Sequence, residues 1–136
     1  MHRMFVLFGL VLAVSAAHAD ILPEPDHGPP MATVAGLDFM IQSVEVKFPP
    51  GYTKTAQTVI LTGCTHGHVN CRLARSKSLI GMEVVSVDNS SLRPEHGMIQ
   101  QIADAFARKK GTQKVTLELY ARGSEGSPVK VAFASR

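Results

Sequence analysis

Apolar and polar residues alternate along several stretches of the chain, a pattern typical of β-strands with one buried face. The alternation predicts strands over residues 33–48, 114–120 and 129–133. The β-branched content of residues 55–62 predicts another strand, and the adjacent Val84 and Val85 in residues 82–87 indicate a strand that is buried on both faces. In the first of these stretches the apolar positions change face near Ser43, which indicates a bulge or a bend. Pro49, Pro50 and Gly51 end that strand, because proline cannot donate to a sheet ladder and glycine turns freely.

One segment instead has the three- and four-residue spacing of an amphipathic helix, over residues 94–110. Pro94 suits a first helical position, and Gly111 suits the end. Residues 72–79 favour a short helical turn. Together these elements predict an α+β fold, a small partly open β-barrel or sandwich of about five strands with one long helix.

The first 19 residues have the pattern of a secretory signal peptide. Basic residues His2 and Arg3 precede an apolar run, Met4–Val14, and small residues that end in Ala17-His18-Ala19 follow as a cleavage site. The run is too short for a resident membrane helix. We therefore expect a periplasmic or secreted protein that begins at Asp20 and has no stable membrane insertion after cleavage.

The expected mature chain divides into a lead-in and one domain. Residues 20–31 contain four prolines, which suit an extended segment, and residues 32–136 have the length of a single domain. Without Arg3, the chain has 13 basic and 11 acidic side chains. This small excess makes nucleic acid an unsuitable partner.

Residues 79–120 resemble a PDZ domain. Gly81 precedes a strand with Val84 and Val87, a tight turn at Asp88–Asn89 follows, and the predicted helix leads through Gly111 to the strand of residues 114–120. Upstream, Gly36-Leu37-Asp38-Phe39 is weakly similar to the family's carboxylate-binding loop. The resemblance implies a PDZ-like fold.

In the PDZ family a peptide is added as a strand between the strand after this loop and the long helix. The resemblance therefore implies a peptide-binding set of Gly36, Leu37, Asp38, Phe39, Met40, Ile41, His96 and Ile99. Asp38 brings a negative charge into the loop, and like charges repel. We expect internal or basic segments to bind there in preference to a free C-terminal carboxylate.

Both cysteines of the chain, Cys64 and Cys71, lie in one short segment that also contains His66 and His68. In an oxidising compartment an isolated cysteine pair closes as a disulfide, which is the first interpretation. The alternative is a metal site of Cys64, His66, His68 and Cys71, a ligand set that suits zinc or copper. Both histidines lie between the cysteines, unlike the separate knuckles of a zinc finger.

The sequence contains no catalytic motif such as a glycine-flanked serine elbow, HExxH or a phosphate-binding loop. We therefore expect a non-enzymatic protein without a cofactor. Its predicted function is binding of an extended peptide or protein of the cell envelope by strand addition. The alternative function is that of a small exported copper- or zinc-binding protein using the Cys64–Cys71 loop.

Overall fold

The computed structural model describes residues 25–49, 51–123 and 126–136. The expected signal peptide and residues 20–24 of the expected lead-in lie outside the described residues. The described residues belong to two compact units, the main unit of Pro25–Val44 and Gln57–Arg136 and the hairpin segment of Glu45–Ala56. In the described part of the chain, no helix has the length and apolar character needed to cross a bilayer.

Seven strands form one sheet, which is more than the about five strands that the alternation predicts. They are β1 (Met31–Val34), β2 (Leu37–Phe48), β3 (Tyr52–Cys64), β4 (Glu83–Val87), β5 (Ser90–Ser91), β6 (Lys114–Tyr120) and β7 (Val129–Ala134). Their order is β1-β2-β3-β4-β6-β7, and β5 pairs with β4. The α+β class is confirmed, and the sheet formed by the described strands is not closed.

The N-terminal part of the sheet differs from the prediction. Residues 33–48 are not one strand, because Ala35 and Gly36 have positive φ values of 50° and 78° and turn the chain between β1 and β2. Two consecutive residues in this conformation are typical of a tight β-hairpin turn. The alternation is the same on both sides of such a turn, so periodicity alone did not reveal it.

The predicted long helix is interrupted near its start. Pro94–His96 form a 3₁₀ turn, η1, and the α-helix α3 spans Met98–Arg108. Gly97 separates the two with a φ of 74°, a conformation that breaks the helical path. The predicted helical turn over residues 72–79 begins and ends earlier, as helix α2, Val69–Ser76.

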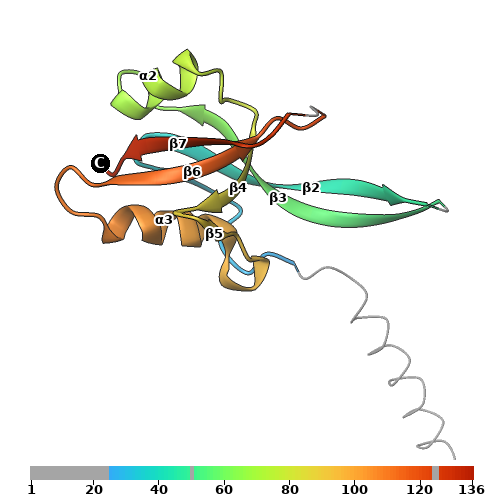
Figure 1. The fold of residues 1–136 in the computed structure, drawn as a ribbon. Coiled ribbons are helices and arrows are strands. Elements are labelled where there is room, and N and C mark those ends of the chain that lie inside the picture. Colours follow the sequence, from blue (N-terminus) through green and yellow to red (C-terminus); the bar gives the residue numbers. More distant parts are fainter. Residues whose placement is uncertain (1–24, 50, 124–125) are drawn as a thin grey trace, which may run out of the picture. The chain divides into compact units, whose positions relative to one another are not determined.

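The core lies within the main unit, where α2 and α3 lie on opposite sides of β6 and β7 (Figure 1). In β6 the alternating residues Val115, Leu117 and Leu119 are fully buried, as the sequence pattern predicts. Helix α3 buries one apolar face against β1, β4 and β6, made of Met98, Ile99, Ile102, Ala105 and Phe106. The packing therefore places β1 beside α3.

Candidate functional site

The edge of β2 that was expected to receive a peptide is already paired with β1. The antiparallel register joins Met31 to Met40 and Val34 to Leu37, and the Ile41 N–H donates to the carbonyl of Pro30 at 2.8 Å. An added strand would need these same backbone groups. Over residues 37–41, the chain itself occupies the expected ligand position.

The lead-in before β1 is attached to the start of α3. The Oδ2 atom of Asp26 accepts the Met98 N–H at 2.7 Å, and its Oδ1 atom accepts the Gly28 N–H at 2.8 Å. A carboxylate at a helix N-terminus satisfies a free amide and interacts favourably with the helix dipole. Gly28 and Gly97 approach so closely that a Cβ atom on Gly28 would lie 2.7 Å from the Gly97 Cα.

The carbonyl groups of the turn between β1 and β2 accept hydrogen bonds from residues outside the hairpin. The Ala35 carbonyl accepts Nδ2 of Asn70 at 2.9 Å, and the Gly36 carbonyl accepts the Thr65 N–H at 2.8 Å. The imidazole of His68 covers Gly36 so closely that a Cβ atom there would lie 2.4 Å from the His68 Cγ. The segment expected to form an open carboxylate-binding loop therefore begins as a covered hairpin turn.

The residues expected to bind a peptide do not share one open surface. Leu37, Phe39 and Ile99 are buried in the core, with exposures of 1% or less. Asp38, Met40 and Ile41 are half-buried, and His96 is exposed in η1. Strand β1 pairs with β2 and contacts α3, so it lies between the strand residues and the helix residues of the expected set.

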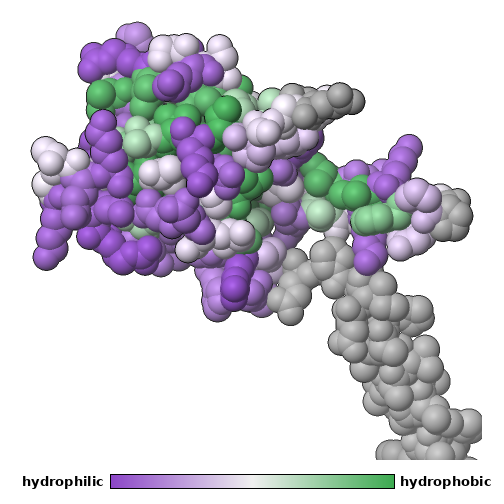
Figure 2. Space-filling view, viewed as in Figure 1, coloured by the Kyte–Doolittle hydropathy of each residue, from purple (hydrophilic) through white to green (hydrophobic). Residues whose placement is uncertain are grey.

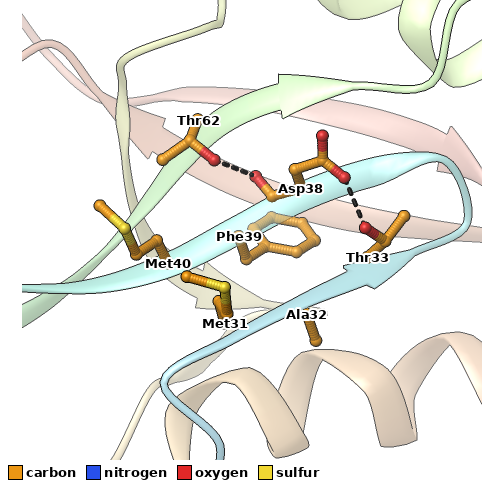
Figure 3. A pocket seen from close by; sticks show the side chains of 7 residues that line it. All are labelled: Met31, Ala32, Thr33, Asp38, Phe39, Met40 and Thr62. Carbon is orange, nitrogen blue, oxygen red and sulfur yellow. Dashed lines mark hydrogen bonds between the residues drawn. The ribbon is translucent and has the colours of Figure 1, made fainter.

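A hollow of about 280 Å³ lies beside the β1–β2 hairpin (Figure 3), lined by Met31, Ala32, Thr33, Asp38, Phe39, Met40 and Thr62. The Asp38 carboxylate accepts the Thr33 hydroxyl at 2.6 Å, and the Thr62 hydroxyl donates to the Asp38 carbonyl at 3.2 Å. Ala32 points toward the helix in Figure 3, whereas Thr33 and Asp38 lie on the other face of the strands. Asp38 thus cross-links the hairpin and is not directed at a peptide terminus.

The Cys64–Cys71 disulfide is present, as predicted, and joins the end of β3 to α2. The bonded sulfurs are not thiolates, so the four-residue metal set expected as the alternative loses two of its ligands. His68 acts as the N-cap of α2, because its Nδ1 atom accepts the Asn70 N–H at 3.0 Å. Within the described ranges, no group of three or more His, Cys, Asp or Glu side chains is placed to hold a metal ion.

Asn70, which the sequence analysis did not single out, is the central polar residue of this region. It is 1% exposed, and its Nδ2 atom donates to the carbonyls of Ala35 and Ala134. Its Oδ1 atom accepts the Ala134 N–H at 2.8 Å. One side chain therefore links α2, the β1–β2 turn and β7. The only sequence signal was an asparagine beside Cys71 and Ala74 on the buried face of α2.

Strand β7 lies at the opposite end of the sheet from β1, and its outer edge is only partly covered. The Ala134 N–H and carbonyl turn outward to Asn70, away from β6. Because outward-facing residues alternate along an antiparallel strand, the backbone groups of Ala132 and Lys130 also face the edge. Both residues are exposed, and Val129 is 44% exposed. The described chain thus has an open strand edge over residues 129–132.

Comparison of the chain with protein-family models, with curated proteins and with solved structures finds no match.

Proposed function

We propose that this protein is an exported, non-enzymatic module of PDZ-like form that binds an extended segment of a cell-envelope protein by strand addition. The receiving strand is β7 instead of β2. The observation that carries the proposal is that the Ala134 backbone groups bond outward to Asn70, from which the alternation of the β6–β7 ladder orients the groups of Ala132 and Lys130 to the same edge. An unpaired edge of this kind is the surface to which an extended peptide adds.

Two features support β7 over β2. The β2 edge is paired with β1, and because β1 precedes β2 directly in the same hairpin, a free peptide would compete with an intramolecular strand at high effective concentration. The β7 edge has no such competitor over residues 129–132 among the described strands. A partner therefore gains backbone hydrogen bonds at β7 without displacing any of the described strands.

The PDZ-like form is supported by the way the chain fills the space between β2 and α3. The extended β1 lies antiparallel to β2 beside α3, in the position where the resembled family takes a peptide. We interpret β1 as a built-in substitute for that peptide. Ordering a free peptide consumes much of its contact energy, so binding at β7 would have an affinity in about the micromolar range.

The test uses a library of random linear peptides selected on the purified protein, followed by mapping of amide chemical-shift changes. We expect the shifts to cluster at Val129–Ala134. Shifts that instead cluster at Leu37–Ile41 and Met98–Gln100 would return the site to the β2 groove and contradict this proposal.

A pair of variants at one position separates the backbone from the side chain. Ala132→Pro removes the outward N–H without removing a bond to β6, and proline is tolerated on edge strands. Ala132→Ser keeps the N–H and is the matched control. We expect the proline variant to lose peptide binding by about tenfold or more, and the serine variant to bind within about twofold of the native protein. Circular dichroism confirms that both are folded.

A further inference from the structure

The hairpin segment, Glu45–Ala56, concentrates exposed apolar side chains. Three of the seven large apolar residues that are exposed in the described chain lie there, namely Val46, Phe48 and Tyr52, which are 38%, 37% and 54% exposed. None of the described residues of this segment is buried. Single exposed apolar residues are ordinary, but a local group of them marks a contact surface.

These three side chains form a stripe on one face of the hairpin segment. Val46 and Phe48 are two residues apart on β2 and therefore point to the same side. The Phe48 and Tyr52 rings are stacked, with centroids 5.5 Å apart. The Nζ atom of Lys54 lies 5.9 Å from the centroid of the Phe48 ring, which places a cation beside the stripe. In Figure 2 apolar colour runs along this segment with hydrophilic side chains beside it.

The charges of the segment favour a negatively charged partner. Lys47 and Lys54 outnumber the single acid, Glu45. Lysine side chains lay their apolar stems along an apolar surface and keep the ammonium groups in the polar layer. Phenylalanine and tyrosine rings in this setting suit the boundary between lipid headgroups and acyl chains, where the tyrosine hydroxyl stays hydrated.

The backbone at the turn also suits an environment with little water. Pro49 has no N–H, and the Gly51 N–H donates to the Phe48 carbonyl at 2.7 Å. Strands β2 and β3 pair with each other along the hairpin. Backbone donors that lack a partner are costly outside water, and at these described positions they are absent or bonded.

We propose that the hairpin segment is a membrane-surface contact, with Phe48 and Tyr52 entering the interfacial layer of an anionic bilayer and Lys47 and Lys54 contacting its headgroups. This contact is independent of strand addition at β7. It reaches only the interface and does not span the bilayer. A second copy of the chain or a soluble protein would need only the apolar stripe. The cation beside the stripe, Lys54, and the bonded turn favour lipid.

The experiment measures flotation of the mature protein with vesicles of equal parts phosphatidylglycerol and phosphatidylcholine. We expect the native protein to bind, and Phe48→Ser with Tyr52→Ser to reduce the partition coefficient by about tenfold. Val69→Ser with Ile80→Ser is the matched control, because Val69 and Ile80 are 48% and 38% exposed in the main unit. This control is expected to bind like the native protein.

Two further measurements distinguish the occupants. The chain has no tryptophan, so Tyr52→Trp provides a unique fluorophore, whose emission should shift to the blue on vesicle addition. Lys47→Glu with Lys54→Glu should weaken binding to the anionic vesicles and leave weak binding to pure phosphatidylcholine unchanged.

Four outcomes would overturn the proposal. Three of them are equal flotation of the Phe48 and Tyr52 double variant, no flotation of the native protein, and an indole emission that vesicles leave unshifted in the Tyr52→Trp variant. The fourth is a vesicle-independent dimer, seen by sedimentation, that the Phe48 and Tyr52 substitutions abolish.

Discussion

Asn70 shows how one buried polar side chain connects segments that are distant in the sequence. Its amide has the donor and acceptor of a peptide group, so it completes the backbone bonding of Ala134 as a neighbouring strand would. It also bonds the Ala35 carbonyl.

Replacing Asn70 with Ala should therefore destabilise the protein strongly. The substitution removes three hydrogen bonds and leaves backbone groups of the half-buried Ala35 and Ala134 without these partners, for an expected loss of about 2 to 4 kcal/mol in the free energy of unfolding. Urea denaturation measures the change. Gln100→Ala is the control, because Gln100 is exposed and its side chain bonds Asp104 on the surface of α3, and its change should be close to zero. A small effect at Asn70 would mean that solvent replaces its bonds.

At the scale of elements, α3 is the helix that the periodicity of the sequence predicted best. Its buried positions Ile99, Ile102 and Phe106 recur at the three- and four-residue spacing that predicted the helix, and Gln100 faces solvent. The start of the helix was less accessible to prediction. The Met98 N–H donates to the carboxylate of Asp26, 72 residues earlier, and this bond caps the helix. No local pattern contains that information.

Phe106→Ala tests the orientation of α3. The Phe106 side chain is 4% exposed, so its removal should leave a cavity and cost about 3 to 5 kcal/mol in the free energy of unfolding. Thermal and urea denaturation of the variant provide the measurement. The exposed neighbour Ala107 offers a second comparison, since Ala107→Ser should change stability by less than about 0.5 kcal/mol. Comparable losses at Phe106 and Ala107 would contradict the observed helix orientation.

For the whole molecule, the division into two units separates a packed core from a segment without one. The main unit contains all the residues of the buried apolar cluster, including the fully buried Val115, Leu117 and Leu119 of β6. The hairpin segment has only exposed and half-buried residues in its described part. Local stability follows buried apolar contact, so the two units should differ in how easily they open.

Hydrogen exchange measured by mass spectrometry should report this difference. We expect backbone amides of residues 45–56 to exchange at least about a hundredfold faster than those of β6, because opening the hairpin segment exposes little buried surface. Peptides that cover residues 114–120 serve as the internal reference. Similar protection in both regions would indicate that the hairpin segment is covered in solution, for example by a second copy.

Local sequence patterns were sufficient for several features of the fold. The alternation in residues 114–120 determined β6 and its buried face, because a strand side chain changes face at every residue. The spacing of Ile99, Ile102 and Phe106 determined the buried face of α3 for the same kind of reason. The isolated pair Cys64 and Cys71, in an expected exported chain, predicted the disulfide that the structure contains.

The candidate site depended instead on which distant segments meet. The PDZ resemblance predicted a peptide site on the edge of the strand after Gly36. Tertiary packing places β1 on that edge, and the open strand edge is at β7. The role of Asn70 likewise requires Ala35 and Ala134 to be near α2, and such contacts have no periodicity along the chain. The sequence by itself therefore determined the α+β class and the buried faces of β6 and α3. The tertiary structure decided which edges and turns remain available, because hydrogen bonds between distant segments cover some of them.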